Sequence, residues 1–352
     1  MKLSILHVLL VATEMLISCI VTMAISSCGP IENFTENLTD LEAIDLTPPI
    51  LTGFTVVDSS SIVMSFDEDV KIEAGKLRVE PSLGVTDIDI EGNTIRISTG
   101  SQEMGKRYSM VGEVTDLKGN SNSFIKDFYG HNGDLPGLLI NEFTTRGSGR
   151  HPDFVELFVT EGGNMGGVTL LNGTLRNWKN RLIFPAFTVE RGDFIIVHFK
   201  PRGSEEEKNE TDRKDQSGGY DSSPKAFDFW VEDGSGLSGN NGVLSLYESP
   251  EGILMDGVIY SNRTSDSDSR YGGFGLAATL ERATELAESG GWYYSGDSVA
   301  PEDAVNPEGS TGTRSICRDR NSADTDRRED WHIVPTRGAT PGTVNRDDRY
   351  SR

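Results

Sequence analysis

Short stretches of alternating apolar and polar residues make up most of the chain between residues 51 and 128. Each stretch has the length of a β-strand, and clusters of Gly, Asp, Asn or Pro separate one stretch from the next. Seven such strands with frequent turn signals are typical of a β-sandwich, so we predict an all-β domain over residues 47–132. The stretches are 51–57, 61–66, 76–79, 85–90, 94–98, 108–111 and 123–128.

A second set of strand patterns follows a Gly-Asp-Leu-Pro-Gly linker at residues 133–137 and continues to residue 345. Residues 154–158 alternate between two faces, with Phe154, Glu156 and Phe158 on one face and Val155 and Leu157 on the other, which supports a strand. Residues 194–197 form a continuous apolar run, which favours a strand buried on both faces. We therefore predict a second β-sandwich over residues 138–345, in tandem with the first.

Two insertions interrupt the second strand pattern. The first, at about 201–236, begins with a dense run of charges and favours a solvated loop. The second, at 272–313, places Leu276, Leu280, Ala283 and Ala287 at helical spacing. We predict one short helix there, ending near the Gly pair at 290–291.

Three segments of the first domain form a recognisable set: residues 48–56, Ser-Ile-Val-Met-Ser-Phe-Asp-Glu-Asp-Val at 61–70, and Asp-Leu-Lys-Gly-Asn at 116–120. Through these segments the domain resembles the bacterial Ig-like domain of S-layer and other surface proteins. Members of that family are usually spacers or display modules without catalysis. The resemblance implies the same role for residues 47–132.

The second domain contains many short motifs in a fixed order. They are Leu-Leu-Ile-Asn-Glu-Phe at 138–143, Asp-Phe-Val-Glu-Leu-Phe at 153–158, and the segments 184–197, 237–246, 257–260 and 340–345. In the order of these motifs, residues 138–345 resemble a lamin-tail domain, which is another Ig-like sandwich. The resemblance implies that both domains share the Ig-like sandwich fold.

The N-terminus has the pattern of a lipoprotein signal peptide over residues 1–27. Its only charges before Cys28 are Lys2 and Glu14, and small residues precede Cys28. Cleavage there would leave a thiol that can carry lipid and anchor the chain. An uncleaved membrane helix is the alternative, although Glu14 would be costly at mid-bilayer. Cys19 ends a similar quartet, but cleavage there would leave an apolar stretch on the mature terminus.

Composition limits the partners of the chain. Residues 28–46 are polar and acidic and are expected to form a flexible tether, and residues 346–352 form a polar tail. The formal net charge of −22 disfavours nucleic acid as a partner, because phosphate neutralisation supplies most of that affinity. The three cysteines are too few for a disulfide scaffold or a cysteine-rich zinc site.

Two groups of residues are candidates for binding. Asp319, Asn321, Asp324 and Asp326 offer the oxygen ligands that calcium prefers, but their spacing differs from that of an EF-hand and arginines lie between them. A solvated turn is the favoured interpretation of these four residues, and a weak calcium site is the alternative. Trp292, Tyr293 and Tyr294 form an aromatic cluster, which is either a contact patch or part of the core.

Catalytic signals are weak. His151, Asp153 and Glu156 lie close together in the sequence, but strand alternation places Asp153 and Glu156 on opposite faces, so the default interpretation is that these are polar side chains exposed to solvent. The sequence contains neither HExxH nor GxSxG. We therefore predict no catalytic residues and no cofactor.

The sequence favours a bacterial envelope lipoprotein that binds or spaces rather than catalyses. Its expected partners are a membrane, reached through the N-terminal lipid, and an unidentified protein or glycan. The outer membrane or cell surface is favoured over the inner membrane. An envelope hydrolase with a site formed by the two insertions of the second domain is one alternative, and a structural cell-wall protein is another.

Overall fold

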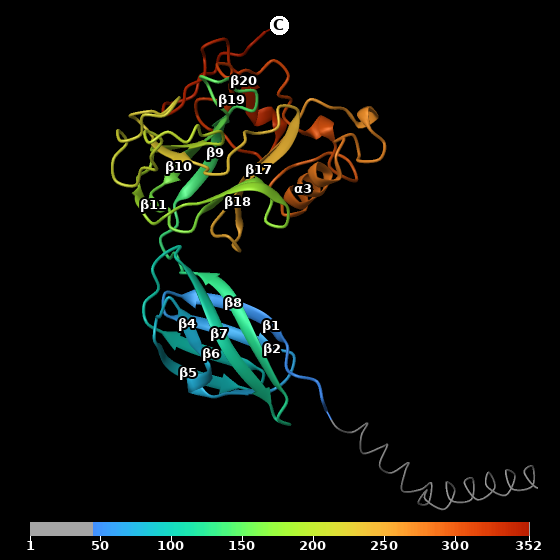
Figure 1. The fold of residues 1–352 in the computed structure, drawn as a ribbon. Coiled ribbons are helices and arrows are strands. Elements are labelled where there is room, and N and C mark those ends of the chain that lie inside the picture. Colours follow the sequence, from blue (N-terminus) through green and yellow to red (C-terminus); the bar gives the residue numbers. More distant parts are fainter. Residues whose placement is uncertain (1–44, 352) are drawn as a thin grey trace, which may run out of the picture.

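The computed structural model describes residues 45–351, which form two β-sheet domains in a row (Figure 1). The predicted signal peptide, Cys19, Cys28 and most of the predicted tether lie outside these residues. Within the described part, strands predominate and one α-helix is present, so the all-β prediction is confirmed. No helix in this part of the chain has the length and apolar character needed to cross a bilayer.

The first domain packs two sheets face to face. One has the strand order β1-β2-β6-β5, and in the other β7 is flanked by β8 on one side and by β3 and β4 on the other. Its elements are β1 (Leu51–Asp58), β2 (Ser61–Phe66), β3 (Val70–Ile72), η1 (Ala74–Lys76), β4 (Arg78–Glu80), β5 (Val85–Glu91), β6 (Thr94–Thr99), β7 (Arg107–Asp116) and β8 (Ser121–Tyr129).

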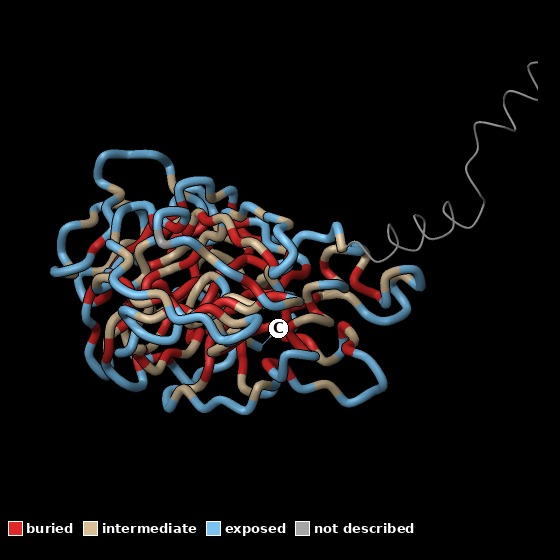
Figure 2. The backbone as a smooth tube through the Cα atoms, turned by 90° about the horizontal axis from the view of Figure 1, so that it is seen from below, coloured by how far each residue is buried: buried red, intermediate tan, exposed pale blue. Residues whose placement is uncertain are grey.

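Alternation along the strands builds the core of the first domain. Every second residue of β2 and of β7 is buried, as the period of a strand requires. Ile62 and Met64 of β2 join Met110 and Val114 of β7 in one buried cluster between the sheets. Figure 2 shows the buried stretches toward the inside of the molecule and the exposed loops around its outside.

The second domain contains a six-stranded sheet, a four-stranded sheet, a two-stranded ribbon and the helix. Its elements are β9 (Gly137–Phe143), β10 (Phe154–Glu161), β11 (Gly163–Asn164), β12 (Thr169–Gly173), β13 (Trp178–Ile183), β14 (Thr188–Val189), β15 (Phe194–His198), β16 (Phe227–Trp230), β17 (Asn241–Tyr247), β18 (Leu254–Ser261), η2 (Ser265–Ser267), α3 (Ala277–Glu288), η3 (Pro301–Asp303), β19 (Ile316–Arg318), η4 (Arg328–Asp330) and β20 (Trp331–Ile333).

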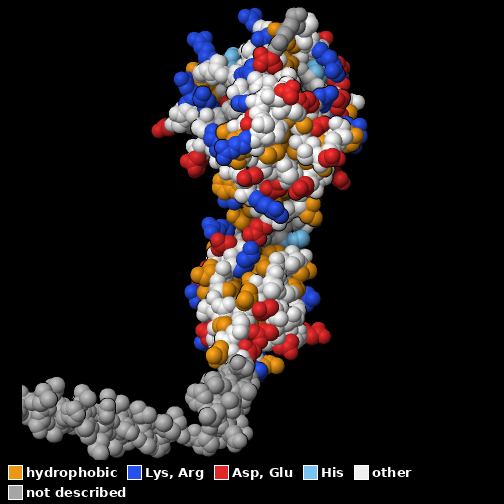
Figure 3. All heavy atoms as spheres, turned by 90° about the vertical axis from the view of Figure 1, so that its right-hand side faces the viewer, with side chains coloured by type: hydrophobic (Ala, Val, Ile, Leu, Met, Phe, Trp, Pro, Cys, Tyr) orange, Lys and Arg blue, Asp and Glu red, His pale blue; other side chains and the backbone are white. Residues whose placement is uncertain are grey.

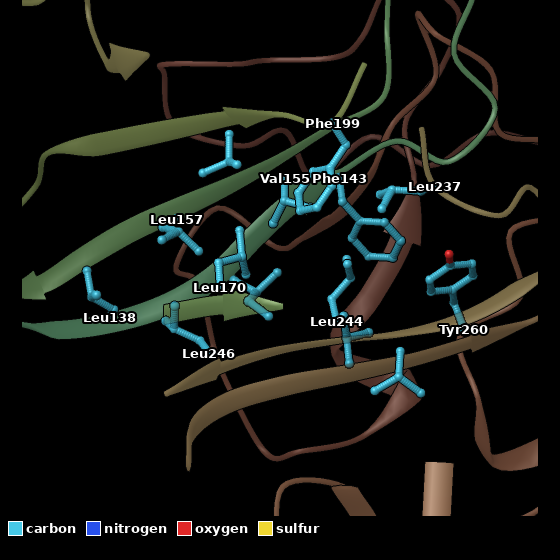
Figure 4. Close-up of a cluster of buried hydrophobic side chains, with 14 of the residues drawn as sticks. Leu138, Phe143, Val155, Leu157, Leu170, Phe199, Leu237, Leu244, Leu246 and Tyr260 are labelled. Carbon is cyan, nitrogen blue, oxygen red and sulfur yellow. The ribbon is translucent and has the colours of Figure 1, made fainter. Parts of the chain in front are cut away.

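The main core of the second domain lies between its two larger sheets. The six-stranded sheet has the order β16-β15-β10-β9-β19-β20, and the other sheet has the order β13-β12-β17-β18. Figure 4 shows Leu157 of one sheet and Leu244 and Leu246 of the other pointing into the same space. All of β15 is buried: Ile195 faces this core, and Ile196 belongs to a second cluster with Phe154. The predicted two-sided burial of this strand is confirmed.

The helix α3 covers the outer face of the four-stranded sheet. Ala283, Leu286 and Ala287 are buried on one side of it, and Leu286 packs over Gly257 of β18. The helix ends where the N–H of Gly290 donates to the carbonyl of Ala287, so the predicted short helix and its end are confirmed. Leu276 precedes the helix and is exposed, because it lies beyond the face that meets the sheet.

The two domains meet through a narrow junction, visible as a constriction in Figure 3. Asn132 donates its amide hydrogens to the carbonyls of Asn164 and Gly166, at 2.7 and 2.9 Å. Lys126 of β8 forms an ion pair with Glu251 of the second domain, at 3.0 Å. Two hydrogen bonds from Asn132 and one ion pair from Lys126 therefore connect the domains across this junction.

Candidate functional site

Arg318 of β19 is the centre of a buried charge network. Its side chain is fully buried and its guanidinium lies 3.3 Å from Asp256, 2.8 Å from Asp324 and 3.6 Å from Asp330. It also stacks on Trp331, with 4.6 Å between the guanidinium carbon and the ring centroid. The Arg318 guanidinium thus provides the positive charge at the centre of these three carboxylates.

The structure divides the calcium candidate into two parts. Asp324 and Asp326 approach Asp256, with one oxygen from each of the three within 4.8 Å of the others. Asp319 instead pairs with Arg349 at 3.2 Å, and the side-chain Oδ1 of Asn321 accepts the N–H of Ala323. Asp256 was not a sequence candidate, because it lies on β18, far from the others in the chain.

The aromatic cluster is also divided. Trp292 is buried and donates its indole N–H to the carbonyl of Asp303 at 3.0 Å, and Tyr294 packs against the core. Tyr293 is 50% exposed, and the Arg327 guanidinium lies 3.9 Å from its ring centroid. Only Tyr293 presents a largely exposed ring for contact.

Two glutamates lie fully buried at neighbouring positions of β9 and β10, and the sequence analysis considered only one of them, Glu156. Glu142 and Glu156 are cross-strand partners, and burial raises the pKa of both carboxyls. Glu156 was expected at the surface, and that expectation was wrong. Asp153 is buried as well, and its carboxylate is satisfied there by the N–H groups of Gly147 and Leu237.

The two glutamates hold a C-terminal segment, residues 340–345, which we call the closing segment. Glu142 accepts both the backbone N–H and the hydroxyl of Thr340, each at 2.9 Å. Glu156 accepts the N–H of Gly342 at 2.6 Å. These three hydrogen bonds fix the closing segment against the sheet.

The first insertion differs from the solvated loop that its charges predict. Glu210 is fully buried and accepts the N–H groups of Gln216, Ser217 and Asp228. Asp228 pairs with His198 at 2.7 Å, again out of contact with solvent. These buried acids fix the loop because its backbone donors bond to protein in place of water.

A cavity of about 320 Å³ opens where both insertions meet the closing segment. We call it the His151 pocket. Imidazole Nδ1 of His151 lies 2.9 Å from a carboxylate oxygen of Asp221, and burial raises the pKa of Asp221. Other lining residues are Phe154, Thr313, Arg337 and Pro341.

The architecture is that of tandem β-sheet domains, the second enlarged by insertions. Residues 136–333, more than half of the chain, match the family model TP_1001_2nd, described as a protein second domain. The chain therefore belongs to that family.

One curated relative is an uncharacterized protein of Treponema pallidum (strain Nichols). It is 28% identical over 194 residues, which make up 54% of this chain and 48% of that protein. The chain therefore spans about half the length of the curated relative it matches.

Two solved structures are similar at a coarse level. A DUF4876 family protein from Bacteroides thetaiotaomicron VPI-5482 gives a TM-score of 0.29 at 13% identity, over 80% of this chain and 90% of that one. The N-terminal part of the bacterial S-layer protein SbsC gives a TM-score of 0.24 at 10% identity, over 61% and 44%. At such scores neither superposition bears on function.

Proposed function

We propose that this protein is a lipid-anchored display module of a bacterial envelope. In this proposal Cys28 carries the lipid, the first domain is a spacer, and the second domain binds a ligand without catalysis. The N-terminal sequence pattern supports the anchor, and the resemblances to surface Ig-like and lamin-tail domains support the division of roles.

The observation that carries the proposal is the placement of the two ends of the first domain. At one end, Asn120 donates to the carbonyl of Asp45, where the described chain begins. At the other end, Gly105 packs against Gly167 of the second domain. The ten residues of β7 run between these ends, a distance of about 33 Å at the usual rise of a strand. An anchor before Asp45 would thus hold the second domain well away from a membrane.

A second candidate function is hydrolysis at the His151 pocket. The observation in its favour is the His151–Asp221 pair, which resembles the orienting half of a nucleophile–base–acid arrangement. The pocket is also formed by both insertions and the closing segment. A binding role needs fewer assumptions, because the six pocket residues named above include no serine or cysteine nucleophile.

Mass spectrometry of the mature N-terminus tests the anchor. We expect a lipid-modified peptide that begins at Cys28 and partitions into detergent. Cys28→Ala should leave an unprocessed or soluble product, while Cys19→Ala, the matched control, should behave like the parent. A lipidated peptide beginning at Cys19, or an intact Met1 terminus on membrane-bound protein, would contradict the proposal.

A further inference from the structure

The His151 pocket is lined by two residues with strained backbones. Asp221 and Arg337 have φ angles of 64° and 63°, in the left-handed region that favours glycine. Arg337 lies in a tight turn closed by a hydrogen bond from the N–H of Gly338 to the carbonyl of Pro335. A long charged side chain at such a position is a starting point for a functional hypothesis.

The Arg337 guanidinium is available to a ligand. Among residues 45–351 it forms no hydrogen bond, ion pair or ring contact, although acidic side chains are abundant in this chain. Asp221 engages Nδ1 of His151, which orients the ring and leaves Nε2 for another partner. The pocket thus presents a free cation beside an oriented imidazole.

The walls of the pocket are held in place before any ligand arrives. A Cβ on Gly312 would lie 2.7 Å from Cβ of His151, so these two backbones are in close contact. A Cβ on Gly342 would lie 2.3 Å from the Ser223 hydroxyl oxygen. The closing segment therefore packs tightly against the loop that carries Asp221. Fixed walls reduce the entropy cost of binding.

We infer that the His151 pocket binds the carboxylate of a small, partly apolar ligand. This inference rests on the proposed binding function of the second domain and names its ligand class. Arg337 offers the planar donor pair that suits a carboxylate. Phe154 and Pro341 offer apolar contact, and the volume of about 320 Å³ suits a ligand of dipeptide size or smaller.

Calorimetric titration of the purified full-length chain tests the inference. The probes are N-acetyl-alanyl-alanine, the same dipeptide with a C-terminal amide, and butyrate. We expect the acid to bind at least tenfold more tightly than the amide. Comparing the dipeptide acid with butyrate then separates a peptide C-terminus from a free short-chain acid as the source of the carboxylate.

Substitution of Arg337 separates binding from folding. Arg337→Gly removes the cation and also relieves the strained φ, so affinity should fall at least tenfold while the melting temperature stays level or rises. Arg337→Lys should retain part of the affinity. Arg191→Ala, which removes an exposed arginine outside the pocket, should bind like the parent.

Three results would overturn the inference: equal binding of acid and amide, parental affinity in Arg337→Gly, or no binding of either acid. The last result would leave the anchor proposal intact, since that is tested at Cys28. Release of free alanine from the dipeptide would show hydrolysis, and would overturn both this inference and the non-catalytic role of the second domain.

Discussion

A buried ion network is expensive at the level of single residues, because each charge loses its hydration. Asp256 and Arg318 are both fully buried, and burial raises the pKa of Asp256 from 3.8 to about 7 despite the guanidinium. Two backbone donors, from Ile140 and Gly257, complete its bonding. The network therefore lowers the stability of the folded state but fixes the positions of β9, β18 and β19 relative to one another.

The raised pKa of Asp256 predicts a pH dependence of stability. The folded protein binds this proton more tightly than the unfolded chain, so its contribution to stability is lost as pH rises from about 4 to about 7. Glu142 and Glu156 act in the same direction. Asp256→Asn should make the decrease of stability with rising pH less steep. It should also lower the free energy of unfolding at every pH, because Arg318 loses one charged partner.

Denaturation followed by tryptophan fluorescence at pH 5, 6, 7 and 8 measures this effect in the second domain alone. All four tryptophans lie there, at positions 178, 230, 292 and 331. Asp266→Asn, at an exposed aspartate, is the control and should follow the parent. Parallel pH profiles for the parent and Asp256→Asn would show that Asp256 does not titrate in this range.

At the scale of elements, the closing segment completes the second domain. Asn345 is buried, and its amide donates to the carbonyls of Asn141 at 3.1 Å and Arg318 at 3.0 Å. It therefore links β9 and β19 through backbone groups that have little access to water. Residues at the end of the chain thus stabilise strands near the beginning of the domain.

Asn345→Ala should destabilise the second domain by about 2–4 kcal/mol, because two carbonyls lose their donor in a buried site. The free energy of unfolding is measured by urea titration with tryptophan fluorescence. Asp348→Ala, three residues further on and exposed, provides the control. If both variants unfold at the same urea concentration, the closing segment contributes little to stability.

The local pattern of apolar and polar residues was sufficient to predict most strands, but it could not predict which strands pair with each other. All seven strand stretches of the first domain contain strands, and only β3 was missed, because its three residues follow an Asp-Glu-Asp run that reads as a turn. Pairing of β9 with β19 could not be predicted, since the partners lie far apart in the chain. Glu142 was missed, and Glu156 was wrongly placed at the surface, for the same reason: both accept hydrogen bonds from the closing segment, far away in the chain.

At the scale of the whole molecule, the junction decides whether the first domain is a rigid spacer. Gly105 has a φ of 67°, and a Cβ there would lie 2.1 Å from the backbone nitrogen of Gly167. The two domains thus touch backbone to backbone, an approach that only glycine permits. Such a contact, with Asn132 and the Lys126–Glu251 pair beside it, restricts bending.

Gly105→Ala should loosen the junction, because the added methyl group cannot fit without moving one domain away from the other. Gly84→Ala is a matched control, because Gly84 has a φ of 65° and nothing lies within 4 Å of its Cβ position. The two variants therefore share the backbone strain, and only Gly105→Ala adds a clash between the domains.

Limited digestion with proteinase K, followed by N-terminal sequencing, should show cleavage within residues 130–137 several-fold faster in Gly105→Ala than in the parent or in Gly84→Ala. That segment is protected in the parent because Asp134 accepts the N–H of Asn164 and Asn132 donates to the second domain. Equal cleavage rates in all three proteins would mean that the contact between Gly105 and Gly167 does not hold the domains together, and the first domain would then be a flexible spacer.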